Sequence, residues 1–293
     1  MTREDLSGAK PEKEFFIGLD SDGCVFPNME LKHKECFIPN IVKHWKLQSV
    51  SRYVREAAEY VNLYSRWRGE NRFLALLRVF DLLAERPEIR RPGARIPEVP
   101  GLRRWVAEAS ALGNPSLKRE IERHAEADLI QSLKWSEAVN AAVADMVTGL
   151  PPFPGVRETL QRMAERADVM VVSGTPGEAL RREWAEHDIR RYVRLLAGQE
   201  LGRKEEHLRL AAGGKYLPGK VLMIGDAPGD LQAARAAGAL FFPINPGGEE
   251  QSWQRLAGEG LDRFFGGAYA GDYEGQLIAE FNRLLPGSPP WKA

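Results

Sequence analysis

The sequence predicts an α/β protein: a doubly wound parallel sheet with a large helical segment inserted after its first strand. Three observations support this fold class. Five short apolar runs, each bounded by turn-forming residues, have the length expected of buried strands. Helical patterns separate the later runs, and strands that alternate with helices are typical of a parallel sheet covered on both faces. One long stretch, residues 28–149, contains helical patterns and almost no strand-like run.

The apolar runs define the expected elements of the sheet domain. The predicted strands are Glu14–Leu19, Asp168–Ser173, Val193–Ala197, Lys220–Gly225 and Ala239–Pro243. The predicted helices between them are residues 156–166, 177–187 and 229–237. The polar residues 1–13 are expected to fray. Residues 248–293 are expected to form a loop and one helix near 274–285.

Residues 28–149 are predicted to form a separate helical domain. Apolar side chains recur at helical spacing in three segments, 50–64, 73–83 and 130–147. Proline-rich segments at 86–101 and 149–155 interrupt the helical patterns. The sheet domain is therefore expected to comprise residues 1–27 and 150–293, with the helical domain inserted between these two parts.

Charge, hydropathy and cysteine content exclude several classes of protein. The 293 residues contain 41 Lys and Arg against 41 Asp and Glu, so the formal charge is zero and gives no support for nucleic-acid binding. No apolar stretch approaches the roughly 18 residues of a transmembrane helix, and the polar N-terminus lacks a signal-peptide core. Two cysteines, Cys24 and Cys36, do not make a disulfide scaffold. We expect a cytoplasmic protein without nucleic-acid or membrane partners, and the sequence leaves its oligomeric state open.

Two carboxylates follow the first predicted strand. Asp20 and Asp22, in the run Asp20-Ser21-Asp22-Gly23-Cys24-Val25, lie at the edge of the sheet where α/β proteins bind ligands. One carboxylate can act as a nucleophile, and the other as a general acid and then a general base. Because neighbouring carboxylates repel each other, a hard cation such as Mg²⁺ would be needed to hold both. Asp and Gly also favour turns without any function, and this alternative stays open.

Further polar residues follow two later strands. The run Ser173-Gly174-Thr175 offers a hydroxyl and backbone N–H groups to an anion. Alternatively, Thr175 and Glu178 form a helix-capping box. Asp226 and Asp230 follow another strand and could complete an oxygen shell around Mg²⁺. Asp230 also suits a helix cap, so its role is not fixed by the pattern alone.

A lysine could complete such a site. Lys204 lies in the charged run Gly202–His207, and a fixed ammonium would offset charge on a phosphoryl group. Lys215 and Lys220 are competing candidates. A lysine in a charged run is ordinarily a solvated surface residue, so this assignment depends on the other motifs.

Taken together, these residues resemble the motifs of the haloacid dehalogenase-like (HAD) hydrolase superfamily, whose members are mostly phosphatases. The family pattern is a strand ending Asp-x-Asp-x-Thr/Val, a strand ending in Ser or Thr, a lysine, and Gly-Asp-x-x-x-Asp after a strand. The matching residues are Asp20 and Asp22, Ser173, Lys204, and Asp226 with Asp230. The resemblance covers residues 14–27 and 150–245, and the helical insertion matches the family's cap in position. Cys24 stands where the family has Thr or Val.

The resemblance implies a Rossmann-like core with an α-helical cap, and a Mg²⁺-dependent phosphatase for a small phosphorylated metabolite. Asp20 would form an aspartyl-phosphate, while Asp22 would protonate the leaving oxygen and then activate water. The implied Mg²⁺ ligands are Asp20, Asp22 through its backbone carbonyl, Asp226 and Asp230. The implied phosphate-binding residues are Ser173, Gly174 and Lys204.

Two other functions remain open at this point. A phosphomutase would use the same two aspartates, and a catalytically idle binding module would share the fold. An aspartate at position 22 favours phosphate monoester chemistry. The helical insertion is expected to choose the substrate, because arginine suits bidentate recognition of a carboxylate or a second phosphate. Its candidate contacts are His33, Lys34, Arg66, Arg68 and Arg72; a solvated helix end is the alternative.

Overall fold

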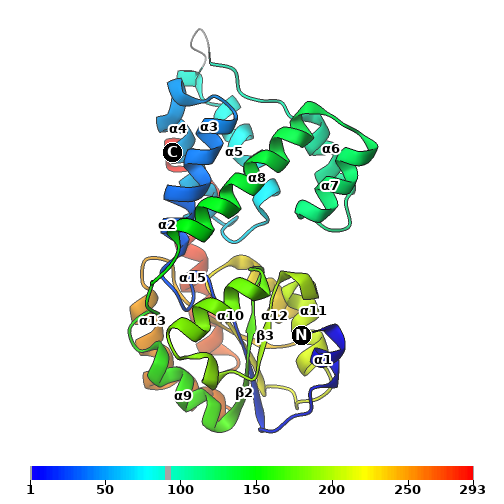
Figure 1. The fold of residues 1–293 in the computed structure, drawn as a ribbon. Helices are drawn as coiled ribbons and strands as arrows, with labels where there is room; N and C mark the ends of the chain where they lie inside the picture. The colour runs from blue at the N-terminus through cyan, green and yellow to red at the C-terminus, as the bar shows by residue number, and fades with distance from the viewer. Residues whose placement is uncertain (1, 90–93, 293) are drawn as a thin grey trace. The chain divides into compact units, whose positions relative to one another are not determined.

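The computed structural model describes residues 2–89 and 94–292 (Figure 1). The chain divides into two compact units. The sheet unit comprises Met1–Met29 and Gly149–Pro286, and the helical unit comprises Glu30–Thr148 and Gly287–Ala293. The expected proline-rich interruption at 86–101 includes residues 90–93, which lie outside the described residues. None of the helices in the described ranges combines the length and apolar character that a membrane span requires.

The sheet unit is built on five parallel strands in the order β3-β2-β1-β4-β5. The strands are β1 (Phe15–Leu19), β2 (Ala167–Val172), β3 (Leu195–Ala197), β4 (Val221–Gly225) and β5 (Leu240–Pro243). Each coincides with a predicted run, so the predicted α/β class with a helical insertion after the first strand is confirmed. The central strand β1 is buried along its whole length, as expected for a parallel strand covered on both faces.

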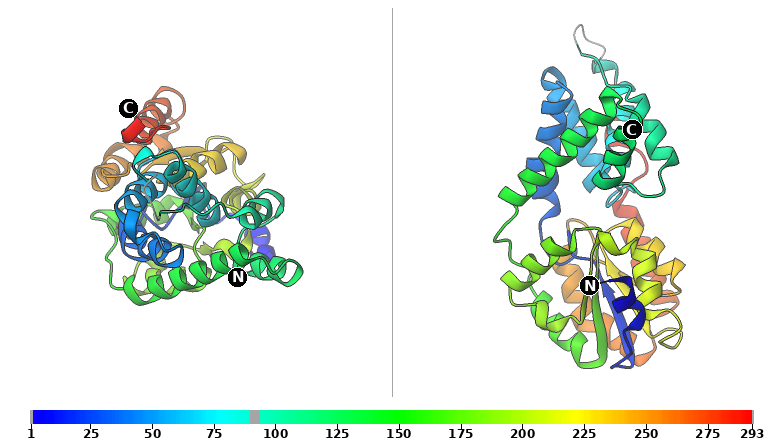
Figure 2. Two further views of the ribbon diagram at one scale, coloured as in Figure 1. Left: turned by 90° about the horizontal axis from the view of Figure 1, so that it is seen from above. Right: turned by 45° about the vertical axis from the view of Figure 1, so that its right-hand side comes forward.

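Helices cover both faces of this sheet (Figure 1, Figure 2). One face carries α9 (Val156–Arg166), α10 (Gly177–Glu186), α13 (Glu249–Arg255) and α14 (Leu261–Gly266). The other carries α1 (Arg3–Gly8), α11 (Lys204–Ala212) and α12 (Pro228–Ala236), and α15 (Asp272–Leu284) lies along β5. Along β1, Phe15, Ile17 and Leu19 pack on the first face and Phe16 on the second, following the two-residue period of a strand.

A glycine in β1 allows one helix to approach the sheet closely. A Cβ on Gly18 would lie 2.7 Å from the Leu208 side chain of α11 and 3.1 Å from the sulfur of Met223. A side chain at position 18 would therefore force the Leu208 and Met223 side chains to shift. This matters because α11 begins at Lys204, one of the predicted site residues.

The helical unit consists of seven α-helices in its described residues. They are α2 (Met29–Leu31), which begins at the boundary between the units, α3 (Ile38–His44), α4 (Ser51–Leu63), α5 (Arg72–Ala84), α6 (Pro100–Glu108), α7 (Asn114–Arg123) and α8 (Ala127–Met146). The core of this unit contains the ring contacts of Phe73 with Trp105 and Trp135. The three predicted helical segments correspond to α4, α5 and α8, whereas α3, α6 and α7 were not predicted.

Short helical turns join many of these elements. In the described residues they are η1 (Lys32–Phe37), η2 (Gln48–Val50), η3 (Pro87–Ile89), η4 (Arg190–Tyr192), η5 (Gln199–Leu201), η6 (Leu256–Gly260) and η7 (Pro290–Lys292). η1 and η6 are π-helical and the others are 3₁₀ turns. The turn η5 leads directly into the loop before α11.

The N-terminal segment differs from the sequence-based expectation. Residues expected to fray form α1, which lies beside α11 (Figure 1, Figure 2). Thr2 and Asp5 form a capping box at its start, and Leu6 is fully buried. One buried leucine among polar residues gives too weak a periodic signal to predict a helix.

The C-terminal segment also differs. The expected loop from 248 contains α13, η6 and α14, and Trp253 and Phe264 from these helices are fully buried. Glycines and charged residues between them hide the apolar period. Residues 287–292 cluster with the helical unit, whereas the sequence places them with the sheet domain. Trp291 lies edge-on to Tyr60 of α4 at 5.6 Å between ring centroids.

Candidate active site

The predicted motifs meet at the carboxyl edge of the sheet. Asp20 directly follows β1, Ser173 follows β2 and Asp226 follows β4. Because β1 pairs with both β2 and β4, these three positions are neighbours. After β3 the chain crosses to the other side of β1 to form β4, so the strand order changes direction at this point. Such a switch point is where open α/β sheets bind ligands.

Three buried carboxylates form a compact group at this edge. Asp20, Asp226 and Asp230 each place a carboxylate oxygen within 4.8 Å of the other two. Their exposed fractions are 5%, 2% and 0%. A Cβ on Gly225 would lie only 2.3 Å from the carboxyl carbon of Asp230. The glycine that ends β4 therefore makes room for this carboxylate.

Lys204 reaches the same group from the start of α11. Its Nζ lies 2.5 Å from Asp20 Oδ2 and 2.7 Å from Asp230 Oδ1. The competing lysines lie elsewhere. Lys215 Nζ donates to the carbonyl oxygens of residues 6, 7 and 9, and Lys220 pairs with Glu14 at 2.8 Å. Of the three lysines considered, Lys204 is the one that the fold brings to the carboxylates.

The group carries more negative charge than the lysine offsets. Burial raises the pKa of Asp20 above its ordinary value, and the nearby Asp226 adds to this while Lys204 opposes it. Burial also raises the pKa of Asp230, again against the effect of Lys204. For Lys204, burial alone would lower the pKa, but Asp20 and Asp230 raise it above the usual range. The lysine is therefore charged, and the carboxylates still gain from a further cation.

These residues fit a hard divalent cation. Carboxylate oxygens are the ligands that Mg²⁺ prefers, and three of them lie within reach of one ion. Asp230 uses its other oxygen, Oδ2, to accept a hydrogen bond from the N–H of Ala227 at 3.1 Å, so its helix-capping role and a metal-binding role are compatible.

The Asp22 carboxylate accepts hydrogen bonds from two side chains. Its Oδ1 accepts a hydrogen bond from Asn28 Nδ2 at 2.7 Å, and its Oδ2 accepts one from the Thr175 hydroxyl at 2.8 Å. The Oδ1 of Asn28 in turn accepts from the N–H of Gly23, whose φ of 71° favours glycine. The turn that Asp and Gly favour is therefore present, and it orients the Asp22 carboxylate.

Ser173 and Gly174 form the expected strand end. Ser173 is buried, and its Oγ accepts a hydrogen bond from the N–H of Thr175 at 3.1 Å. Gly174 is exposed and has open space around it. The alternative capping box is wrong, because α10 starts at Gly177 with Pro176 at its N-cap, and the Thr175 hydroxyl is used by Asp22 instead.

Asn28 and Thr175 were not predicted as partners of Asp22. Trp184 and Trp253 were not predicted either, and their indole N–H groups donate to Ser21 Oγ and to the carbonyl of Cys24. Both indoles thus fix the loop that carries the two aspartates. None of the four has a local pattern that signals the role, since Thr175, Trp184 and Trp253 act on residues that are distant in the sequence, and Asn28 acts within an irregular turn.

Two nucleophile-like side chains near the site are buried. Cys24 is fully buried, and burial, with Asp20 nearby, raises the pKa of its thiol well above the ordinary value, so the thiol is not ionised at neutral pH. His207, a residue of α11, is also fully buried, and neither ring nitrogen has a hydrogen-bond partner. Burial and the nearby Lys204 lower its pKa to about 4.

The five candidate substrate contacts lie in the helical unit. Lys34 pairs with Glu30 at 2.8 Å, and the His33 ring packs on Phe37. Arg68 is buried and donates to the carbonyl of Leu63. Arg66 lies over the Trp67 ring. Arg72 at the start of α5 donates to Ser136 and Asn140.

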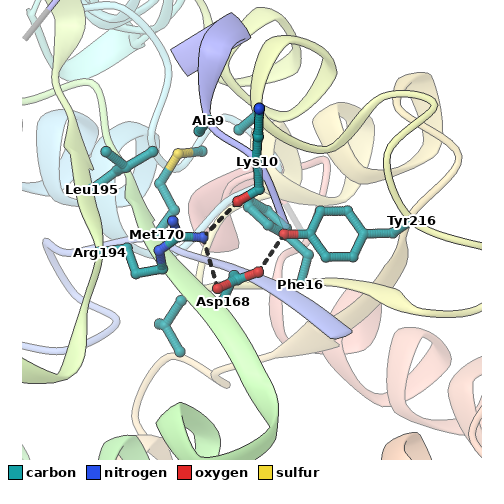
Figure 3. A pocket seen from close by; sticks show the side chains of 10 residues that line it. Ala9, Lys10, Phe16, Asp168, Met170, Arg194, Leu195 and Tyr216 are labelled. Carbon is teal, nitrogen blue, oxygen red and sulfur yellow. Dashed lines mark hydrogen bonds and ion pairs between the residues drawn. The ribbon is translucent and has the colours of Figure 1, made fainter. Parts of the chain in front are cut away.

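A small pocket lies at the opposite edge of the sheet (Figure 3). There the buried Asp168 pairs with Arg194 at 2.8 Å and accepts a hydrogen bond from the Tyr216 hydroxyl at 2.6 Å. It also accepts from the N–H groups of Glu12 and Lys13. Since these bonds tie the segment before β1 to the start of β2, the pocket belongs to a structural anchor and lies away from the predicted motifs.

Comparisons with known proteins extend these observations. The family model of haloacid dehalogenase-like hydrolases matches residues 47–238, more than half of the chain. No curated protein matches the chain in sequence. Similar solved structures include a haloacid dehalogenase-like family hydrolase from Streptococcus pneumoniae, with 12% identity, 91% of this chain and 98% of the other covered, and a TM-score of 0.48. A predicted phosphatase from Clostridium acetobutylicum has 11% identity, coverages of 79% and 85%, and a TM-score of 0.44.

Proposed function

Because this chain belongs to the haloacid dehalogenase-like hydrolases, we propose that it is a Mg²⁺-dependent phosphatase that hydrolyses a small phosphorylated metabolite. The observation that carries the proposal is the meeting of Lys204 with Asp20 and Asp230 beside Asp226. A nucleophile, a cation and a set of metal ligands within a few ångströms are the parts that phosphoryl transfer requires.

In this mechanism the two aspartates of the first motif divide the chemistry. Asp20 attacks phosphorus, and its new O–P bond forms as the bond to the leaving oxygen breaks. Asp22 gives a proton to that leaving oxygen. In the second step Asp22 takes a proton from the water that hydrolyses the aspartyl-phosphate, which restores both side chains. The bonds from Asn28 and Thr175 support this role, since they fix the orientation of the Asp22 carboxylate.

Other residues would bind and orient the phosphoryl group. Ser173, the N–H of Gly174 and Lys204 would hold its oxygens. Mg²⁺, when bound, supplies positive charge that neutralises the phosphoryl oxygens. Asp20, Asp226 and Asp230 would hold the ion through their side chains, and Asp22 through its backbone carbonyl. Substrate choice is the proposed role of the helical unit and its residues His33, Lys34, Arg66, Arg68 and Arg72.

The test is phosphate release from a panel of phosphorylated metabolites and one aryl phosphate. Wild type, Asp20→Asn and Asp22→Asn are compared, with Asp272→Asn as a matched control because Asp272 is exposed at the start of α15. We expect release by wild type and the control, and a loss of at least 1,000-fold in both other variants, as for groups that act directly in catalysis. A chelator should abolish release.

Mg²⁺ binding is measured separately by calorimetry. Binding should weaken from pH 7.5 to pH 5, since Asp20 and Asp230 have raised pKa values and must lose protons to bind metal. Phosphorus NMR on the same mixtures distinguishes hydrolysis from isomerisation of a sugar phosphate. Isomerised product without free phosphate would favour a phosphomutase. Mg²⁺ binding with no turnover of any compound would favour an idle binding module.

A further inference from the structure

We propose that the helical unit contains an oxyanion-binding site at Arg72, where the guanidinium binds a carboxylate or phosphate group through two parallel hydrogen bonds. The inference deepens the proposed function, because it assigns a ligand class to one of the proposed substrate contacts. It is tested by binding without turnover, so its failure can be distinguished from failure of the phosphatase proposal.

The charge of Arg72 has no acidic partner within the described residues. Its Nη1 donates to the carbonyl of Ser136 at 3.2 Å, to Ser136 Oγ at 3.0 Å and to Asn140 Oδ1 at 2.7 Å. All three acceptors are neutral. Burial lowers the pKa of Arg72 to about 10, and no neighbouring charge opposes this. A partly buried cation without a counter-ion is less favourable than one in water.

The position on the helix makes the charge still less favourable. Arg72 is the first residue of α5, directly after the N-cap Asn71, whose Oδ1 accepts from the N–H of Phe73. The N-terminus of a helix carries partial positive charge and favours anions. A positive side chain there acts against the helix dipole. An anion bound at Arg72 would offset both unfavourable terms.

The side chain is held rigidly for binding. The guanidinium lies over the Phe37 ring at 5.1 Å, and the bonds from Nη1 fix its plane. Ser136 is itself fully buried and donates its hydroxyl to Asn114 Oδ1 at 2.7 Å. Since Nη1 is used by the protein and Arg72 is partly exposed, the edge formed by Nε and Nη2 is the one offered to a ligand. Two parallel donors match the two oxygens of a carboxylate or phosphate.

A second arginine on the same helix provides a matched control. Arg78 pairs with Glu70 through two bonds of 2.5 Å and 2.8 Å and lies over the Trp67 ring. Its charge is already compensated by a carboxylate in the two-bond geometry that Arg72 lacks. Replacing Arg78 therefore removes an arginine from α5 but leaves Arg72, the arginine without an acidic partner in the described residues, in place.

The experiment measures how the melting temperature rises as inorganic phosphate or malonate is added. A chelator is present throughout, and sodium chloride of equal ionic strength serves as the reference. Wild type, Arg72→Gln, Arg78→Gln and Lys204→Gln are compared, the last to remove the phosphate site proposed in the sheet unit. We expect the half-saturating concentration of the better anion to rise at least tenfold in Arg72→Gln and to stay within twofold in Arg78→Gln. Lys204→Gln should lose only the part of the phosphate response that belongs to the sheet unit. The better anion identifies the ligand group as phosphate or carboxylate.

Saturation that is unchanged in Arg72→Gln would overturn the inference, as would a response lost only in Lys204→Gln. Gln at position 72 keeps a polar group for Ser136 and Asn140 and removes the charge. If this variant does not fold, an NMR titration of the wild-type protein tests the inference instead. The Nε–Hε resonance of Arg72 must then move as the anion is added. A resonance that stays fixed while the melting temperature rises would place the anion elsewhere.

Discussion

Asp20 and Asp22 are the same residue type two positions apart, yet their surroundings differ. Asp20 is buried with two other carboxylates and a lysine, whereas Asp22 is partly exposed and is oriented by an amide and a hydroxyl. Such a difference in environment is how neighbouring carboxylates come to have different roles in catalysis. We therefore expect the proposed role of Asp22 to depend on the Asn28 and Thr175 side chains.

Removing either donor should impair the Asp22 carboxylate without touching Asp20. For Asn28→Ala and Thr175→Val we expect kcat to fall about tenfold or more, since a hydrogen bond to a charged group contributes about 1.5–3 kcal/mol. The alkaline limb of the pH–rate profile should move to higher pH, because the charged form of Asp22 loses a stabilising donor. Thr175→Ser keeps the hydroxyl and should stay near wild type. A drop in kcat with an unmoved profile would argue for a purely structural role.

His207 should make the fold sensitive to acid. Its folded pKa of about 4 lies below the ordinary value of 6.5, so the unfolded chain binds the extra proton between these values. Stability therefore falls as pH drops below 6.5, and the loss is complete below about pH 4. Replacing His207 with Leu should remove this dependence. The free energy of unfolding of the variant minus that of wild type should be about 2 kcal/mol larger at pH 5 than at pH 8.

Urea unfolding at both pH values measures this gain. Comparing the two proteins isolates His207, because the raised pKa values of Asp20 and Asp230 act in both. An equal difference between the proteins at pH 5 and pH 8 would contradict the prediction.

At the scale of elements, α1 supports the start of α11. Arg3 donates to the carbonyl of Leu201 at 2.7 Å and pairs with Glu206 at 3.0 Å. Between them lies Gly202, with a φ of 123°, where a Cβ would meet the Arg3 guanidinium at 2.7 Å. At the other end of α1, Lys215 binds its last carbonyls. The helix thus fixes the loop that presents Lys204.

We expect Arg3→Met to reduce kcat about three- to tenfold, because Lys204 would be less well fixed in position. KM should change less for substrates that bind mainly through other residues. Arg209→Met, on the exposed side of α11, should have no effect. Arg3→Lys should restore part of the rate, since it keeps one charged donor. Equal kcat for Arg3→Met and Arg209→Met in a steady-state assay would rule out the supporting role of α1.

The elements also show what the sequence can and cannot predict. The strands were predictable because each is a continuous apolar run, and their order along the chain brought Asp20, Ser173 and Asp226 to one edge. Lys204 could be assigned only through the family pattern, since its charged run has no signal of its own. Helix α1 was missed because Leu6 is its one buried residue. The segment α13–α14 was missed because glycines and charged residues between its buried side chains hide the apolar period.

At the scale of the whole molecule, the last described residues belong to the unit that begins at Glu30. The guanidinium carbon of Arg86 lies over the Trp291 ring, 3.8 Å from the centroid of that ring. The Trp291 ring is also edge-on to Tyr60. Arg86 is buried and pairs with Glu56 at 2.6 Å. Lys292 adds an ion pair with Glu85.

Trp291→Ala should therefore destabilise the helical unit by about 2–3 kcal/mol, somewhat less than for a fully buried tryptophan. Hydrogen exchange should show faster exchange in α4 and α5, while β1 and β2 keep their protection. Trp291→Phe retains a ring and should lose less. Uniform loss of protection across both units would indicate that they unfold together. It would also contradict a stabilising role of residues 287–292 that is confined to the helical unit.

The strand order has a consequence for the time course of folding. β1 is made first, but its partners β2 and β4 begin at Ala167 and Val221. Until those residues leave the ribosome, an apolar strand has both edges unpaired. The helical unit depends mostly on contacts between residues 30 and 148, which are near in sequence and form quickly. Newly made chains should therefore pass through a state with a folded helical unit and an unpaired β1, and it is in this state that they are most exposed to aggregation and to chaperones.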